Sequence, residues 1–204
     1  MGIAKKELLR DVFLLHWDWD TEPEFSGTDD EPTADVTGST EDLVLKMYDR
    51  FKKDALSKYN WRSAIRYETI TCTEPATNID KRYKYTGAVP DDFIKLVGLW
   101  QDEERHITAI GMANIVGETV FSHLEEITIG YMANVSETDF DNWLTDYMIA
   151  YIASAGATLA GVSNDKRAEL ISLEQNKWFS CSNTDYEMEQ KDEVSPSISQ
   201  FLIS

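Results

Sequence analysis

The helical and the extended patterns of this chain meet within residues 39–71, which read STEDLVLKMYDRFKKDALSKYNWRSAIRYETIT. Ser39-x-x-Asp42 has the spacing of a helix capping box. An apolar stripe at helical spacing follows it: Leu43, Val44, Met47, Tyr48, Phe51, Ala55 and Leu56. From Tyr67 to Thr71 the residue types alternate with a period of about two, which is typical of a strand. The stretch therefore predicts a helix over 41–59 that leads directly into a β-region.

The β-region extends over residues 62–134 and two further helices follow it. Short strand-like segments in this region are separated by turn formers such as Gly87 and Pro90-Asp91. Connections this short predict an antiparallel meander, because a parallel crossover needs a dozen residues or more. A second capping box, Ser136-x-x-Asp139, and a later apolar pattern predict helices over 137–160 and 165–189. The chain is therefore expected to be α+β, with a bundle of long helices beside the meander.

Both ends of the chain differ in composition from this core, which covers residues 43–191. Residues 1–17 predict a short N-terminal helix from their apolar spacing. Residues 18–42 hold ten acidic residues and no Lys or Arg, and they are interrupted by proline and glycine, so an acidic linker or long loop is expected. Residues 192–204 are rich in serine and end in an apolar tip. We interpret them as a C-terminal docking tail in which four residues make the contact: Ile198, Phe201, Leu202 and Ile203.

The charge balance limits the partners that the chain can have. Lys and Arg total 19 against 37 Asp and Glu, so the formal net charge is -18. Counterion release onto Lys and Arg therefore cannot drive tight DNA binding. Cys72 and Cys181 form no CxxC pair, which argues against a zinc site or a disulfide framework. No stretch approaches the roughly 18 apolar residues of a membrane span, so no membrane partner is expected.

The sequence carries no pattern that indicates catalysis. Neither a GxxxxGK nor a GxGxxG loop is present, which argues against nucleotide hydrolysis. His16, His106 and His123 lack the i, i+4 spacing of helical metal ligands. His123 with Glu125 and Glu126 could offer ligands, but neighbouring strand residues point to opposite faces. We therefore expect no catalytic residue, metal ligand or cofactor site, and we interpret the chain as a protein that is not an enzyme.

Three tryptophans stand where a structural anchor is expected. Trp61 follows the end of a helix, Trp100 lies within a predicted strand, and Trp143 lies on an apolar helix face. A buried aromatic side chain removes some 150 to 250 Å² from water, so each ring could fix one element onto the next. We predict that Trp61, Trp100 and Trp143 are buried structural anchors.

Five landmarks occur in order between residue 43 and about residue 180. They are the helix that ends in Tyr-Asn-Trp61, the strand Tyr67-Glu-Thr-Ile-Thr71, the run Tyr83-Lys-Tyr85-Thr-Gly-Ala-Val-Pro90-Asp91-Asp92-Phe93, the strand Ile127-Thr-Ile-Gly-Tyr131, and the Phe140-x-x-Trp143 helix. In this order they resemble the tail tubular protein A family, the connector ring beneath the portal in podoviruses related to phage T7. The acidic insert before Ser39 and the tail after Glu193 depart from that family's pattern.

The resemblance implies a structural virion protein of the tail or neck that is assembled in the host cytoplasm. Residues 43–191 would form the connector core, in a homo-oligomeric ring of twelve copies that docks on the portal and attaches the tail nozzle. DNA would pass through the channel without specific binding. Two other classes stay open: an acidic adaptor or inhibitor that mimics DNA and binds a basic host protein, and an enzyme with a carboxylate site that the sequence does not reveal.

Overall fold

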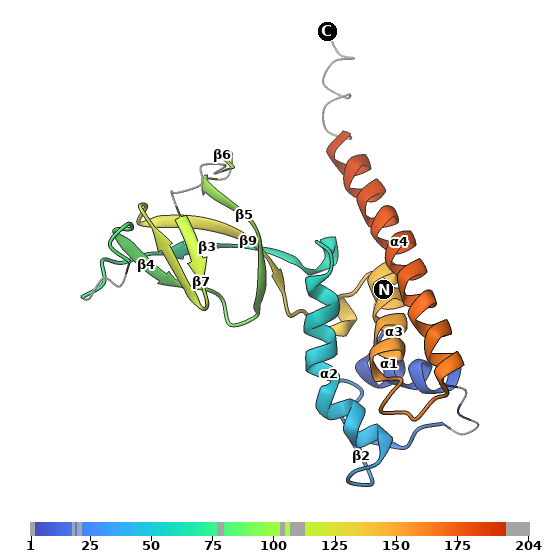
Figure 1. The fold of residues 1–204 in the computed structure, drawn as a ribbon. Coiled ribbons are helices and arrows are strands. Elements are labelled where there is room, and N and C mark those ends of the chain that lie inside the picture. The colour runs from blue at the N-terminus through green and yellow to red at the C-terminus, as the bar shows by residue number, and fades with distance from the viewer. Residues whose placement is uncertain are drawn as a thin grey trace. The chain divides into compact units, whose positions relative to one another are not determined.

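The computed structural model describes residues 3–17, 19, 22–76, 80–102, 105–106 and 113–194. The chain divides into a helical unit, Met1–Ser63 with Val135–Ser204, and a β unit, Ala64–Asn134. The chain consists of helices and antiparallel sheets, and all but one small hairpin of the sheets lie in the β unit (Figure 1), which confirms the predicted α+β class. The β unit is an insertion between the two halves of the helical unit.

The helical unit follows the predicted pattern in its first two helices. Its elements are α1 (Lys5–Asp11), the π-helical turn η1 (Val12–His16), α2 (Thr40–Ser57), α3 (Asn142–Gly156) and α4 (Asn164–Val194). The Ser39 hydroxyl caps α2 by accepting the N–H of Asp42 at 3.3 Å. The buried face of α2 includes Val44, Tyr48 and Phe51 of the predicted stripe. A capped amphipathic sequence therefore forms the helix that its pattern predicts.

α3 begins later than the sequence predicts. The capping box at 136–139 forms only a 3₁₀ turn, η3 (Glu137–Asp139), and its serine makes no capping hydrogen bond. Phe140 then adopts an extended conformation, and Asp141 caps α3 by accepting the N–H of Leu144 at 2.8 Å. The Phe140 ring is almost completely buried. In the extended conformation Phe140 buries its ring in the unit. This burial is favoured over an uninterrupted helix that would begin at residue 137.

The junction between α3 and α4 also differs from the predicted bounds. α3 ends at Gly156 rather than at residue 160, and Gly161 adopts a φ of +66° in the turn that follows. The Ser163 hydroxyl accepts the N–H of Lys166 at 3.2 Å and so caps α4. α4 contacts α3 and continues to Val194, beyond the predicted end at 189.

Part of the predicted acidic linker, residues 18–42, is a β-hairpin. β1 (Phe25–Gly27) pairs antiparallel with β2 (Pro32–Ala34). Phe25 is buried against the aromatic ring of Phe13 in η1, with 5.8 Å between the ring centroids. The hairpin was not predicted because most of its residues are polar. Besides Phe25, the buried Pro32 and a hydrogen bond from the Lys6 N–H to the Asp29 carbonyl oxygen at 2.9 Å hold it to the unit.

The N-terminal helix is joined to α3 by Trp17. The indole Nε1 donates to the Ala153 carbonyl oxygen at 3.0 Å, and the side chain is buried. Its ring lies so close to Gly156 that a Cβ at this position would be 2.7 Å from a ring carbon. The small residues that the sequence places in the second half of this helix therefore accommodate a tryptophan ring.

The β unit consists of two antiparallel sheets. The larger one has the order β3 (Ile65–Thr71), β9 (Glu126–Ala133), β5 (Phe93–Asp102), β6 (Arg105–His106), and the smaller one the order β4 (Tyr85–Ala88), β8 (Thr119–Ser122), β7 (Ala113–Val116). This arrangement is more complex than the predicted meander, because β9 lies between β3 and β5. β9 is largely buried from Ile127 onward, which explains why the last strand takes a central place.

The first and last strands of the β unit pair with each other along their whole length. Ile65 lies opposite Met132, and Thr71 lies opposite Glu126. The chain segment that leaves the helical unit and the one that returns to it therefore continue into neighbouring, hydrogen-bonded strands.

Candidate functional site: anchors of the connecting segments

The outgoing segment, residues 58–63, is held in the helical unit by Trp61. The side chain of Trp61 is fully buried, and its ring stacks on Tyr147 of α3 with 5.1 Å between centroids. Its Nε1 donates to the carbonyl oxygen of Ala55 in α2 at 3.4 Å. Tyr59 adds an edge-on ring contact at 5.0 Å. Trp61 therefore ties the end of α2 to α3 just before the chain leaves the unit.

The same segment has a second contact, with α4. The backbone N–H of Arg62 donates to Oδ2 of Asp185 at 3.3 Å, and Asp185 is a buried residue. A buried carboxylate is costly unless it accepts hydrogen bonds, and the Arg62 N–H supplies one of them. The outgoing segment is thus connected to α2, α3 and α4.

The returning segment, residues 135–140, is held by a buried ion pair. Lys52 of α2 places its Nζ 3.0 Å from Oε1 of Glu137, and both side chains are only 10% exposed. The Tyr48 hydroxyl, one helical turn earlier in α2, donates to the same oxygen at 2.8 Å. Lys52 also lies 5.7 Å from the centre of the Phe140 ring. The returning segment is therefore fixed to α2 by charge, hydrogen bonding and a buried ring.

The environment of Tyr48 suits a hydrogen-bond donor and not a nucleophile. Burial raises the pKa of Tyr48 well above its usual range, and the negative charge of Glu137 raises it further. The hydroxyl consequently remains protonated at neutral pH and donates to the carboxylate. The Lys5 ammonium lies 4.3 Å from the centre of the Tyr48 ring. The cluster is built to hold elements together rather than to transfer a proton.

The predicted tryptophan anchors have three different outcomes. Trp61 is buried as described above. Trp143 is half-buried rather than buried, and it lies next to the fully buried Leu144 in α3. The side chain of Trp100 lies outside the described residues.

The candidate docking residues of the tail also lie outside the described residues. These are Ile198, Phe201, Leu202 and Ile203. Their role stays a prediction.

Sequence reasoning did not find Lys52, Glu137 and Asp185. Glu137 lies at an unassigned position between Ser136 and Asp139 of the predicted capping box, and a buried polar partner cannot be recognised from one member of the pair. Lys52 did carry a signal, because it follows Tyr48 by four residues and so lies on the apolar stripe of α2. A lysine on an otherwise buried helix face predicts an acidic partner from elsewhere in the fold.

Within the described ranges, no group of three or more His, Cys, Asp or Glu side chains is placed to hold a metal ion. The His123 ring lies 5.2 Å from the ring of Tyr83. Burial raises the pKa of both thiols, Cys72 and Cys181, which lowers their reactivity.

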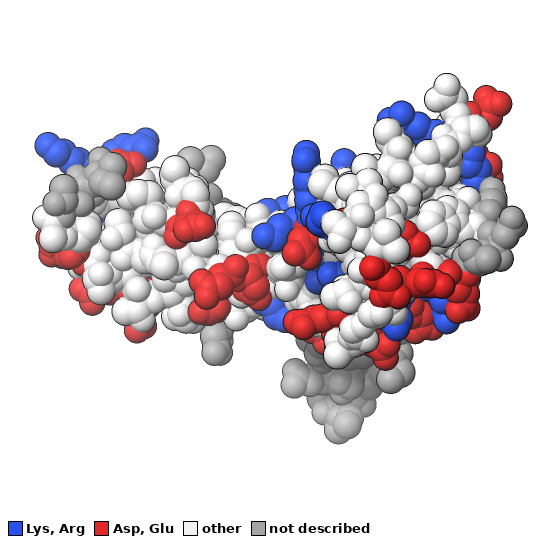
Figure 2. All heavy atoms as spheres, turned by 90° about the horizontal axis from the view of Figure 1, so that it is seen from below, with Lys and Arg blue, Asp and Glu red and all other residues white. Residues whose placement is uncertain are grey.

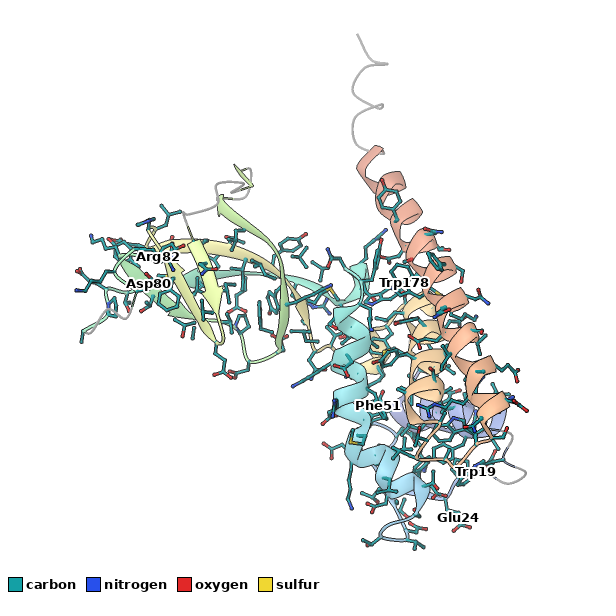
Figure 3. The ribbon with its side chains drawn as sticks, in the orientation of Figure 1. Trp19, Glu24, Phe51, Asp80, Arg82 and Trp178 are labelled. Carbon is teal, nitrogen blue, oxygen red and sulfur yellow. The ribbon has the colours of Figure 1, made fainter. Side chains whose placement is uncertain are left out.

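Acidic side chains gather on the helical unit, as Figure 2 shows in red. Four of them, Glu22, Glu24, Asp35 and Glu41, line a pocket of about 270 Å³ together with Trp19, Val36 and Ser39. Figure 3 labels Trp19 and Glu24 at one end of the unit. We name this cavity the acidic pocket.

Neither the protein-family models nor the curated proteins that were compared with this sequence contain a match to it. The helices of the described part include none with the length and apolar character that crossing a membrane requires.

Proposed function

We propose that this chain is a head-to-tail connector subunit of a short-tailed bacteriophage, a structural virion protein and not an enzyme. The proposal starts from the resemblance of residues 43 to about 180 to the tail tubular protein A family. It is supported by the α+β architecture, in which a β unit is inserted into a helical unit. In this proposal one unit faces the portal and the other faces the tail.

The observation that carries the proposal is the double anchoring of the inserted unit. A connector must keep its two ends joined while packaged DNA presses on the portal. Here the outgoing segment is held by Trp61 and Asp185, and the returning segment by Lys52 and Glu137. Removing one partner of a buried ion pair costs about 3–5 kcal/mol, so these contacts resist separation of the segments from the helices. An arrangement of this kind suits a mechanical function.

The proposed assembly is a ring of twelve copies in the neck of the virion. Cyclic symmetry makes each contact between neighbours heterologous and closes the ring. The partners are the portal protein on one side and the tail nozzle on the other. At a formal charge of -18 for each copy, such a ring repels the phosphates of DNA and lets the duplex pass without binding.

The tail, residues 192–204, is proposed to dock on the portal or on a neighbouring subunit. Deleting residues 194–204 should leave the melting temperature of the free subunit unchanged and stop it from joining DNA-filled heads. A second variant keeps the length of the tail and replaces four apolar residues by serine: Ile198, Phe201, Leu202 and Ile203. It should give the same loss of assembly if these side chains make the contact. Normal yields of infectious particles from the truncated chain would refute the docking role.

A second function, that of an acidic DNA mimic which binds a basic host protein, is favoured by one observation. Residues 18–42 contain ten acidic residues and no Lys or Arg, and four of these acids line the acidic pocket. A DNA mimic would act as a monomer or dimer in infected cells and would be absent from virions. Mass spectrometry of purified particles separates the two functions, because a connector must be present in every particle.

A further inference from the structure

α4 carries apolar side chains on two different faces. One face is buried and includes Leu170 and Cys181. The other is exposed and carries Ile171, Phe179 and Tyr186, which are 40%, 60% and 52% exposed. At about 100° per residue, these three side chains fall within an arc of about 80°. Ser182 lies in the same arc but is buried, so Ile171 and Phe179 are exposed on one side of it and Tyr186 on the other. We name these three exposed positions the α4 ridge.

The α4 ridge leaves apolar side chains exposed to water. A fully buried aromatic ring removes about 150 to 250 Å² from solvent, so two half-exposed rings and an isoleucine leave on the order of 300 Å² of apolar surface. A patch of this size is comparable to the largest apolar patch of a typical monomer and often marks an interface. Trp178 lies beside Phe179 in an edge-on ring contact, with 4.9 Å between the ring centroids.

An exposed cation stands at one end of the ridge. Arg167 precedes Ile171 by four residues and so lies one turn away on the same side of α4. Its side chain is exposed, and no acidic side chain among the described residues lies within ion-pair distance of its guanidinium. Lys166 and Lys177, by contrast, pair with Glu169 and Asp146.

The acidic pocket has the chemistry that a guanidinium requires. Carboxylates from Glu22, Glu24, Asp35 and Glu41 surround it, and Trp19 supplies an aromatic wall. A planar guanidinium stacks on aromatic rings and donates to carboxylates at the same time. Val36, which also lines the pocket, is 65% exposed and offers an apolar border.

We infer that the α4 ridge is an interface for a second copy of this chain, in which Arg167 enters the acidic pocket of the neighbour. Ile171 and Phe179 then cover the exposed border of that pocket around Val36. Charge complementarity favours a second copy of this chain as the partner, because the same chain carries both the unpaired guanidinium of Arg167 and the acidic pocket. Because the two surfaces differ, each copy offers one of each, and the contact can repeat from copy to copy. This inference is argued from the described residues alone, and it deepens the connector proposal, whose ring requires a heterologous contact between copies.

Charge reversal tests the contact. Sedimentation equilibrium of the purified full chain, up to about 1 mM, measures its self-association. Arg167→Glu should weaken association by about tenfold or more, because it places a carboxylate against the four carboxylates of the pocket. Glu24→Arg should weaken it less, because Glu22, Asp35 and Glu41 still attract the guanidinium. The chain that carries both changes should associate more tightly than the Arg167→Glu variant, because the introduced glutamate then meets the introduced arginine. Phe179→Ser should also weaken association.

Two control variants separate this contact from a general effect of charge. Lys53→Glu on α2 changes the net charge as Arg167→Glu does, and Glu118→Arg in the β unit changes it as Glu24→Arg does. Neither control should alter association by more than about twofold, because neither residue belongs to the ridge or the pocket. A parent chain that stays monomeric at 1 mM would overturn the inference. So would an Arg167→Glu variant without effect, or a double variant that associates no better than Arg167→Glu. The ring of the connector proposal could use another contact between copies, so that proposal is tested separately by particle assembly.

Discussion

Replacing Glu137 by alanine should destabilise the helical unit by about 3–5 kcal/mol. The change leaves the Lys52 ammonium without its partner in a site where its side chain is only 10% exposed, and an uncompensated buried charge carries a cost of this size. It also removes the acceptor of the Tyr48 hydroxyl. For a chain of this length each kcal/mol lowers the melting temperature by about 2–4 °C, so a fall of roughly 6–20 °C is expected.

Two further variants identify the cause of that loss. Glu137→Gln keeps a hydrogen-bond acceptor for Tyr48 but removes the negative charge, so it should destabilise less than alanine does. The double change Lys52→Met with Glu137→Leu replaces both charged groups by apolar ones. It should recover most of the stability, because a buried ion pair contributes little relative to well-packed apolar side chains.

Urea unfolding followed by circular dichroism provides the free energies. The midpoint should move while the slope with urea stays constant, since the surface exposed on unfolding hardly changes. A loss below about 1 kcal/mol for Glu137→Ala would refute the interpretation of the Lys52–Glu137 pair as an anchor. A double apolar variant that is as unstable as the single alanine variant would show that charge is not the cause.

Three other substitutions probe the same unit. Trp61→Ala should cost about 3–5 kcal/mol in urea unfolding, because it removes a fully buried ring, and a melting temperature unchanged within 2 °C would contradict this. Gly156→Leu should lower the melting temperature, because its side chain would collide with the Trp17 ring, and an unchanged value would refute that contact. Because the folded-state pKa of Tyr48 is raised, the stability that Tyr48 contributes is complete below about pH 10 and is lost as pH rises further. Tyr48→Phe should therefore lose less stability between about pH 9 and 11 than the parent chain, and equal losses would argue against the raised pKa.

The helices of the helical unit were predictable where a local cap and a long apolar stripe agree. Ser39 and the stripe after it define α2, and the structure matches that prediction within two residues at each end. At α3 two caps compete, Ser136 and Asp141, and the burial of Phe140 decides between them. A pattern of local residue types does not reveal tertiary packing of this kind.

The order of the strands and the anchors were less accessible from the sequence. That β9 lies between β3 and β5 depends on long-range burial, and short turns alone suggest a meander. The pair of Lys52 with Glu137 joins residues that are 85 positions apart in the sequence, so neither residue reveals the other. Trp61 was predictable as an anchor because a large ring directly after a helix needs a place in the core.

The most direct test of the connector proposal is immunogold electron microscopy of purified phage particles with antibodies raised against this chain. The proposal predicts gold label at the neck, between the head and the tail. Nearly every particle in which the antibody can reach the neck should carry this label. Purified particles that are free of this chain, or label spread over the capsid surface, would contradict it.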